Sequence, residues 1–231
     1  NAILSTAFDS IGYLWVGTKD GVARYNGRTW TIIDLTPIAG SNYIQAICTG
    51  SDGSMWFGTN GGGLARLHEG NWSTVSMRDG LPSNDVTSLA EAVSADGSAV
   101  LWIGTSAGIS FVGADGVVRS SLVEQSGRRI TGLYAANLRG EVWAMIEGVG
   151  AARFKSGVWR IFGESDGLPR SLHTTALDTG ALGDARCIVV GAGAGLFVFD
   201  GERFSRYVAE GVPETRQRGF ATLRELTGSD G

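Results

Sequence analysis

The chain has 231 residues, 36 Gly but only 4 Pro, and a formal net charge of -4. This length can bury a sizeable core, and the charge excludes the basic excess typical of nucleic-acid-binding proteins, so no nucleic-acid partner is expected. Without a collagen period, the Gly content indicates many tight turns between short strands. No signal peptide opens the chain, and we interpret it as a fragment of a longer protein.

A Trp-containing segment recurs along the chain at intervals of about 41 or 46 residues. A fixed period of this size is typical of repeat architectures. The fourth copy keeps the Trp as Trp143, whereas the fifth has Val189 in its place. The five copies are Leu14 to Thr18, Met55 to Thr59, Leu101 to Thr105, Val142 to Met145 and Ile188 to Ala192.

Each repeat contains four apolar segments in the same order. The first carries apolar residues three apart, as in Ile44 and Ile47, and a Gly-bearing turn such as Asp52-Gly53 follows it. The second is the Trp segment, which is apolar almost without alternation, as in a strand buried on both faces. The third starts at a Gly, and the fourth alternates in the manner of an outer edge strand. Asp-Gly turns between such segments predict antiparallel hairpins.

Four antiparallel strands in about 43 residues are typical of a β-propeller blade. We therefore predict an all-β fold in which the Trp of each second strand fills the space between neighbouring blades. Insertions in the turn between the first and second strands, from Val93 to Val100 and from Asp178 to Arg186, would explain the longer intervals. The predicted blades of this single propeller fragment cover residues 1–36, 42–78, 84–123, 128–164 and 171–208, and a sixth starts at 218–226.

The segment Phe220 to Leu226 repeats the first-strand pattern already present at Ile3 to Phe8. This strand would be surplus in a ring of five blades, so we expect an incomplete arc of a ring of seven or more. Such an arc would leave apolar faces of its first and fifth blades uncovered. We expect the fragment to be poorly soluble or to associate through these faces, for example as a dimer.

The segment Gly80 to Leu89, which reads GLPSNDVTSL, precedes Asp96-Gly97 and the Trp segment at Leu101 to Thr105. This combination resembles the two-component regulator propeller repeat. The resemblance implies a non-catalytic, ligand-sensing input module on the periplasmic or extracellular face of a bacterial inner-membrane receptor. In the parent protein, a membrane-spanning segment and a kinase or cyclase output module would follow, and several members of the family sense saccharides.

Catalytic chemistry finds little support in the sequence. His68 falls in a turn, where solvation explains it, and His173 falls at the start of an inner strand; neither has metal-ligand spacing, so no metal and no cofactor are expected. The run Gly191 to Gly195 lacks dinucleotide-loop spacing, and a strand follows it. Streptogramin lyases are propellers that also carry a Leu-Trp pair, which leaves a lyase-like enzyme as a less favoured alternative.

A ligand site, if present, is expected at the channel mouth, because the connections before each first strand and the turns after each second strand emerge at the same end of a propeller. Asn, Asp, Arg and Tyr side chains there suit sugar hydroxyls or anionic groups. Ordinary turn chemistry explains Asn and Asp equally well, and a protein-interaction or structural propeller remains the alternative function. The candidate ligand-binding residues are Asn42, Tyr43, Asn84, Asp85, Arg128, Arg129, Arg170 and, just inside, His173.

Overall fold

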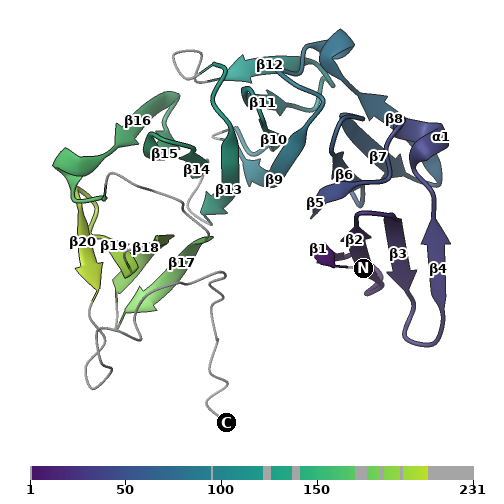
Figure 1. The fold of residues 1–231 in the computed structure, drawn as a ribbon, viewed down its shortest axis with the longest axis horizontal. Coiled ribbons are helices and arrows are strands. Elements are labelled where there is room, and N and C mark those ends of the chain that lie inside the picture. The colour runs from purple at the N-terminus through teal and green to yellow at the C-terminus, as the bar shows by residue number, and fades with distance from the viewer. Residues whose placement is uncertain are drawn as a thin grey trace.

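The computed structural model describes residues 2–94, 96–121, 126–136, 141–169, 176–182, 185–192 and 195–207. It contains five four-stranded antiparallel sheets, each made of four consecutive strands. The sheets stand side by side around an open arc, with the first strand of each sheet innermost (Figure 1). The predicted all-β fold of four-stranded propeller blades is confirmed.

The twenty strands of the five sheets follow one another in chain order. Sheet 1 contains β1 (Ile3–Phe8), β2 (Leu14–Thr18), β3 (Gly21–Tyr25) and β4 (Trp30–Ile33). Sheet 2 contains β5 (Ile44–Thr49), β6 (Met55–Thr59), β7 (Leu64–His68) and β8 (Asn71–Val75). Sheet 3 contains β9 (Val86–Val93), β10 (Ala99–Thr105), β11 (Gly108–Val112) and β12 (Val118–Ser121). Sheet 4 contains β13 (Ile130–Ala136), β14 (Glu141–Ile146), β15 (Gly150–Lys155) and β16 (Val158–Phe162). Sheet 5 contains β17 (Ala176–Leu182), β18 (Ala185–Ala192), β19 (Gly195–Phe199) and β20 (Phe204–Tyr207).

The extra residues in repeats 3 and 5 lengthen the paired strands. The sequence placed them in turns between the first and second strands, but β9 and β10 stay paired as far as Val93 opposite Ala99. Likewise, β17 and β18 stay paired as far as Leu182 opposite Ala185. Antiparallel pairing satisfies backbone donors and acceptors that a longer loop would leave to water, so the insertions extend the hairpins.

In sheets 1 to 4, the Trp of the second strand packs between its own sheet and the next one. Trp15, Trp56, Trp102 and Trp143 are at most 8% exposed, as predicted. The ring centroid of Trp15 lies 5.3 Å from that of Phe57 in sheet 2. Burial of such large side chains contributes several kcal/mol each to the stability of the arc, on the order of 3–5 kcal/mol by analogy with truncation to Ala.

In the Trp segments of sheets 1 to 3, the fourth residue is Gly, which allows the next sheet to approach closely. A Cβ at Gly58 would lie only 2.6 Å from Cγ1 of Val86, the first residue of β9. A Cβ at Gly17 would lie 2.7 Å from Cγ2 of Ile44, the first residue of β5. The following Thr closes the turn, since Thr59 Oγ1 donates to the carbonyl of Gly63 at 2.8 Å. The repeated pentapeptide therefore encodes contact between sheets as well as strand structure.

Short helical turns lie in the connections between sheets. They are α1 (Thr36–Ala39) and 3-10 turns at Met77–Asp79 and Glu164–Asp166. The two 3-10 turns correspond to the repeated Asp-Gly-Leu-Pro sequence: the Asp side chain accepts from a preceding amide, and the Leu, Leu81 or Leu168, is buried. Among the helices of the described residues, none is long and apolar enough to cross a membrane.

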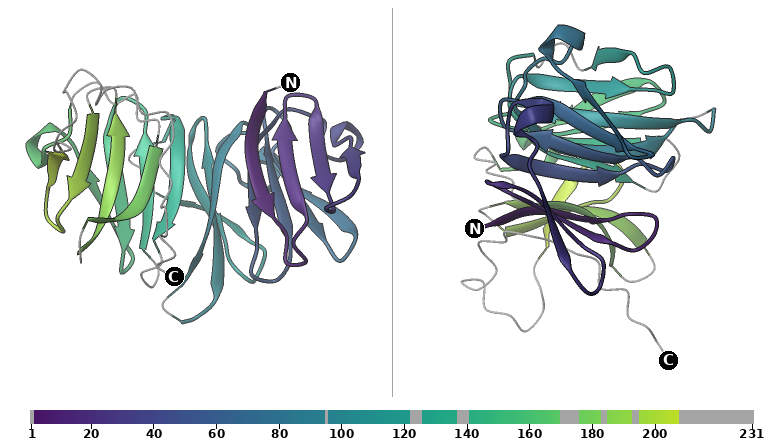
Figure 2. Two further views of the ribbon diagram at one scale, coloured as in Figure 1. Left: turned by 90° about the horizontal axis from the view of Figure 1, so that it is seen from below. Right: turned by 90° about the vertical axis from the view of Figure 1, so that its right-hand side faces the viewer.

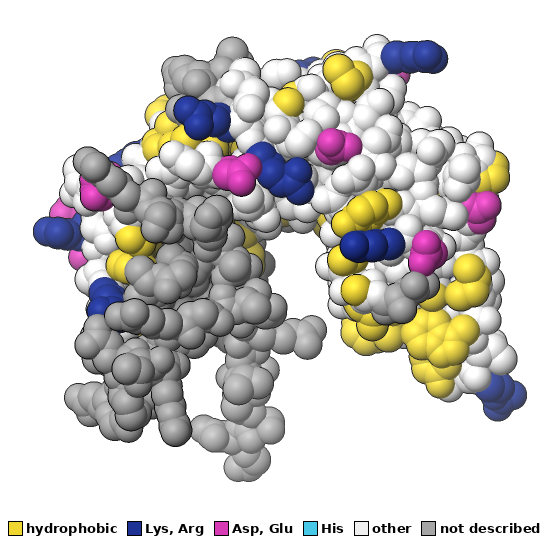
Figure 3. All heavy atoms as spheres, viewed as in Figure 1, with side chains coloured by type: hydrophobic (Ala, Val, Ile, Leu, Met, Phe, Trp, Pro, Cys, Tyr) yellow, Lys and Arg dark blue, Asp and Glu magenta, His cyan; other side chains and the backbone are white. Residues whose placement is uncertain are grey.

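In the described part of the chain, the arc is open between sheet 1 and sheet 5, which lie on opposite sides of the gap (Figure 1). Ile3 at the uncovered face of sheet 1 is 64% exposed, whereas its counterpart Ile44, which faces sheet 1, is fully buried. Figure 3 shows hydrophobic side chains gathered over sheet 1, where Phe8, Trp30 and Ile32 are also exposed. The predicted sixth first strand, Phe220 to Leu226, lies outside the described residues.

Candidate functional site

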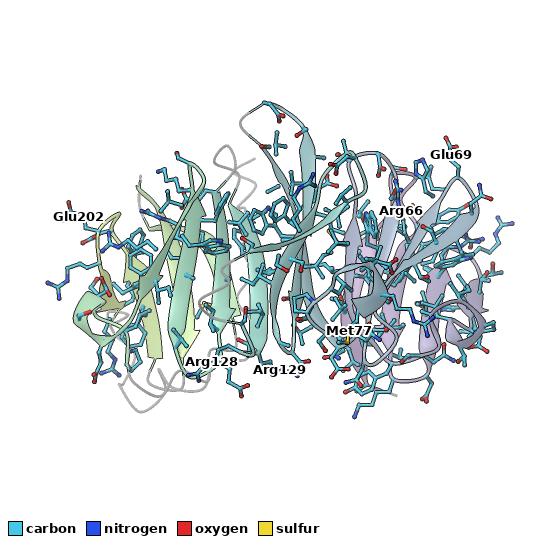
Figure 4. The ribbon with its side chains drawn as sticks, turned by 90° about the horizontal axis from the view of Figure 1, so that it is seen from above. Arg66, Glu69, Met77, Arg128, Arg129 and Glu202 are labelled. Atoms are coloured by element: carbon cyan, nitrogen blue, oxygen red, sulfur yellow. The ribbon has the colours of Figure 1, made fainter. Side chains whose placement is uncertain are left out.

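The arc has two flat faces, and the strands run from one face to the other, so the turns of all sheets gather at these faces (Figure 2). Each face is called an end of the propeller below. The residue before the first strand is held at one end by the same backbone hydrogen bond in three sheets. The carbonyls of Tyr43, Asp85 and Arg129 accept the amides of Asn60, Ser106 and Glu147 at 2.8 to 2.9 Å. Figure 4 shows Arg128 and Arg129 at one end and Arg66 and Glu69 at the other.

Asn42 and Asn84 have equivalent structural roles. Asn42 Oδ1 accepts the amide of Leu35 at 2.7 Å, and Asn84 Oδ1 accepts the amide of Met77 at 2.8 Å. Each side chain therefore closes the connection that leads into its sheet, which is the turn chemistry that Asn favours. The hydrogen bonds use the carbonyl oxygen of the side chain and leave its amide donors for other partners.

The remaining candidates differ in their surroundings. Asp85 Oδ2 accepts from the hydroxyl of Ser106 at 3.4 Å, and the Asp85 amide donates to Ser83 Oγ at 3.0 Å. Arg128 is exposed. Arg170 and His173 lie outside the described residues.

Tyr43 and Arg129 meet at a cavity of about 290 Å³ on the inner side of the arc. Four further residues line it, and each is the second residue of an innermost strand in four successive sheets. These four residues are Leu4, Gln45, Thr87 and Thr131. The cavity is therefore built from equivalent positions of four repeats, and we name the space lined by these six residues the channel-mouth cavity.

Hydrogen-bond donors dominate the polar groups of the channel-mouth cavity. Arg129 Nη2 donates to Gln45 Oε1 at 3.4 Å, which connects sheets 2 and 4 across the arc. Gln45 Nε2 is buried and has no acceptor. The hydroxyl of Thr87 is already used, since it donates to the carbonyl of Ile130 at 2.6 Å. A ligand rich in acceptors would satisfy the orphaned amide of Gln45, which otherwise costs free energy.

Arg129 also brings a positive charge to the channel mouth, where Asp85 holds the equivalent position in sheet 3. Arg129 forms no ion pair with a carboxylate in the part of the chain that the structure describes. Lys19 Nζ lies 5.5 Å from the ring centroid of Tyr43, so a second cation borders the same region. Unpaired cations beside unused donors favour an anionic or acceptor-rich ligand.

His68 lies at the end of β7, away from this cavity. Its Nδ1 is 3.0 Å from the hydroxyl of Ser54 and 4.0 Å from Asp52 Oδ2. The ring is therefore held by neighbours at a partly exposed position. Within the described ranges, no group of three or more His, Cys, Asp or Glu residues could hold a metal ion.

Gln45, Thr87 and Thr131 were not among the residues predicted from the sequence. The available signal was their register: each is a polar residue directly after the first apolar residue of an inner strand. Each also falls where the pairing with the second strand shifts register: for example, Ile44 pairs with Thr59 but Ala46 with Gly58, which leaves Gln45 unpaired. Such a bulge turns the side chain of the unpaired residue away from the regular faces of the strand.

Comparisons with known proteins agree with this architecture. Residues 39–61 match the family model described as two component regulator propeller. Comparison with curated proteins gives no match.

Among solved structures, the extracellular domain of a candidate hybrid two-component system, BT4673, from B. thetaiotaomicron is 19% identical, with a TM-score of 0.67 over 91% of this chain. The corresponding domain of BT3049 from the same organism is also 19% identical, with a TM-score of 0.52 over 89% of this chain. This chain spans 28% and 34% of the lengths of those two domains. Virginiamycin B lyase from Staphylococcus aureus is 15% identical, with a TM-score of 0.72 over 98% of this chain and 75% of its own.

At these identities, similarity to the solved structures establishes the fold alone, because propellers of one fold perform different functions. The family match falls on the connection and first two strands of sheet 2, where the Trp segment Met55 to Thr59 lies. The resemblance proposed from the sequence is thereby confirmed: the chain carries a two-component regulator propeller repeat within a β-propeller arc.

Proposed function

We propose that this chain is a non-catalytic sensory input module of a bacterial signal-transduction receptor, and that it binds an anionic polar ligand, in particular a saccharide with a carboxylate, at the channel-mouth cavity. The parent receptor would hold it on the periplasmic or extracellular side of the membrane and connect it to a kinase or cyclase module. The two-component regulator propeller repeat supports the sensory role, as does the fold shared with extracellular domains of two-component systems.

The observation that carries the ligand proposal is the convergence of Arg129, Gln45 and Tyr43 from two non-adjacent sheets on one cavity. The Arg129 guanidinium can bind a carboxylate in a bidentate manner, and the buried Gln45 amide can donate to a sugar oxygen. An aromatic ring such as that of Tyr43 can pack against the apolar face of a sugar. The volume of about 290 Å³ suits a monosaccharide unit.

A non-catalytic role is supported by the composition of the cavity. Its six lining residues are Leu, Tyr, Gln, Arg and two Thr, and they include neither a nucleophile beside a base nor a pair of carboxylates. Sharing a fold with a lyase does not transfer the lyase chemistry, because function depends on the site.

Calorimetric titration with glucuronate and with neutral glucose tests this proposal. We expect glucuronate to bind, and we expect the Arg129→Ala variant to bind it about tenfold more weakly or worse, since a hydrogen bond to a charged group contributes roughly 1.5–3 kcal/mol. Arg128→Ala is the matched control: it removes the same charge from the neighbouring exposed residue, which does not line the cavity. Equal affinity of both variants for glucuronate, or no binding to any member of a uronate and neutral saccharide panel, would contradict the proposal.

A further inference from the structure

A second cavity, of about 400 Å³, lies between sheets 2 and 3. It is lined by side chains of both sheets, including Trp56, Arg66 and Glu91, together with the apolar Leu101 and Val112. Arg66 and Arg129 lie at opposite ends of the propeller (Figure 4). The cavity beside Arg66 is therefore separate from the channel mouth. We name it the intersheet cavity.

The intersheet cavity exists because sheet 3 lacks an aromatic pair that other sheets carry. At equivalent register, the third and fourth strands pair an aromatic or large apolar residue with an aromatic one in the other four sheets. The pairs are Tyr25 with Trp30, Leu67 with Trp72, Phe154 with Trp159 and Phe199 with Phe204. In sheet 3, the same positions hold Val112 and Val118.

In sheets 4 and 5, the aromatic pairs pack against the Trp of the preceding sheet. Trp102 lies 4.8 Å from Phe154 and 5.7 Å from Trp159, measured between ring centroids. Trp143 lies 5.1 Å from Phe199 in the same way. Trp56 instead packs in a cluster with Leu101, Val112 and other aliphatic residues. Two valines occupy far less volume than two aromatic rings, so a space of ring-like dimensions remains beside Trp56.

The polar groups at the cavity are also incompletely paired. The indole N–H of Trp15 donates to Asp9 and that of Trp143 to Glu141, both at 2.8 Å. The Trp56 indole N–H has no acceptor among the described residues, because Gly50 stands where sheet 1 has Asp9. A Cβ built on Gly50 would lie 3.3 Å from Trp56 Nε1 and 3.2 Å from Glu91 Oε2. A donor and an acceptor without partners therefore border the same space.

The charged group of the intersheet cavity that has no oppositely charged partner is a carboxylate. Arg66 Nη2 contacts Asp52 Oδ2 at 2.6 Å, and the guanidinium lies 5.0 Å from the Trp56 ring centroid, so Arg66 and Asp52 neutralise each other. Glu91 Oε1 accepts the Ser51 amide at 2.8 Å, while Oε2 has no donor in the described part of the chain. The Glu91 carboxylate thus remains the unpaired charge beside the ring-sized space.

We propose that the intersheet cavity binds an arylalkylamine, that is, a planar aromatic ring that carries a protonated amino group on a short alkyl chain. Its ring takes the place of the missing aromatic pair against Trp56, and its amino group donates to Glu91 Oε2. The volume falls within the range of small-molecule sites, and an aromatic ring packed edge-to-face on an indole is a favourable arrangement. This proposal is independent of the saccharide site at the channel mouth, since the two cavities share no lining residue.

Calorimetric titration with tryptamine and with indole tests the proposal. We expect tryptamine to bind the unaltered chain at least tenfold more tightly than indole, because its ammonium group adds a charge-assisted hydrogen bond to Glu91. The Glu91→Gln variant should lose this difference while keeping its affinity for indole. Tryptamine and indole binding with the same affinity in both proteins would overturn the role of Glu91.

Val112→Phe tests the role of the missing ring, because it places in sheet 3 the residue that sheets 4 and 5 carry as Phe154 and Phe199. We expect it to fill the cavity, abolish binding of both compounds and leave the thermal unfolding midpoint unchanged or raised. Val158→Phe makes the same substitution at a residue that is 67% exposed in sheet 4 and should bind as the unaltered chain does. Undiminished tryptamine binding by a folded Val112→Phe variant, or no binding by the unaltered chain, would refute the proposal.

Discussion

At the scale of the residue, neighbouring side chains of similar chemistry have different tasks. Arg128 is exposed, whereas Arg129 lines the channel-mouth cavity and reaches Gln45. Asn42 and Tyr43 are also adjacent, but Asn42 closes a connection while Tyr43 lines the cavity. The direction of a side chain relative to the strand that follows it decides whether the side chain stabilises a connection or lines the cavity. The chemistry of the side chain alone does not decide this.

Gly167 illustrates how strictly the Asp-Gly-Leu-Pro connection is constrained. Its φ is +95°, and a Cβ there would collide with the carbonyl of Phe204 in sheet 5. We expect Gly167→Ala to lower the free energy of unfolding by about 2–3 kcal/mol through backbone strain and displacement of β20. Urea denaturation measures this change.

Gly157 provides the matched control, since its φ is +82° but a Cβ would meet no atom within 4 Å. Gly157→Ala should cost only about 1 kcal/mol, the strain of the left-handed conformation itself. Equal losses in the two variants would show that the contact with sheet 5 is unimportant.

At the scale of the element, the sequence predicted the strands well because the repeat supplies five copies of one pattern. The Trp segments became second strands as expected, since apolar residues, turn glycines and period agreed with each other. The site was harder to predict. Tyr43 and Arg129, which line the channel-mouth cavity, were among the candidate residues. Gln45, Thr87 and Thr131 line it too but were not among the candidates, because a polar residue inside an apolar strand is interpretable only after its register is known.

The insertions were placed in turns for a related reason. Local composition between Val93 and Val100 resembles a turn, but continued pairing of β9 with β10 satisfies more backbone groups. The absence of an aromatic pair in sheet 3 was likewise visible in the sequence, yet its consequence depends on which face of β11 and β12 meets sheet 2.

Substitution of the second-strand Trp residues by Phe should lower the free energy of unfolding by different amounts. Trp143 is fully buried and donates to the buried carboxylate of Glu141, so Trp143→Phe leaves that carboxylate without its donor. We expect a loss of about 3 kcal/mol in the free energy of unfolding. Trp56→Phe removes no such hydrogen bond and should cost about 1–2 kcal/mol.

Chemical denaturation of the two Trp variants side by side provides the measurement. Lys155, whose Nζ lies 3.5 Å from Glu141 Oε2, moderates the loss but is itself exposed. A Trp143→Phe variant no less stable than Trp56→Phe would contradict the assigned role of the indole N–H.

At the scale of the whole molecule, the open arc determines how the chain behaves in isolation. Packing of each sheet on the next buries residues such as Ile44, but none of the described sheets covers the corresponding face of sheet 1. Ile3, Phe8 and Ile32 are each more than 60% exposed there. Contiguous apolar surface of this kind drives association in soluble proteins.

We therefore expect the isolated chain to self-associate through sheet 1. Its sedimentation coefficient should rise with protein concentration, and Ile32→Lys should reduce this rise by placing a charge in the contact. Val158→Lys, at an exposed position on the outer strand of sheet 4, should not. Sedimentation as a monomer at all protein concentrations would contradict self-association through the exposed face of sheet 1.

The two cavities allow each proposed site to serve as the control for the other, because each has its own ligand and its own variant. Glucuronate and tryptamine are titrated separately into Arg129→Ala and Val112→Phe, with the unaltered chain as reference. We predict that Arg129→Ala loses glucuronate binding and keeps tryptamine binding, whereas Val112→Phe shows the reverse. If the proposed ligand site at the channel mouth is wrong, Arg129→Ala will bind glucuronate as the unaltered chain does, or neither will bind it.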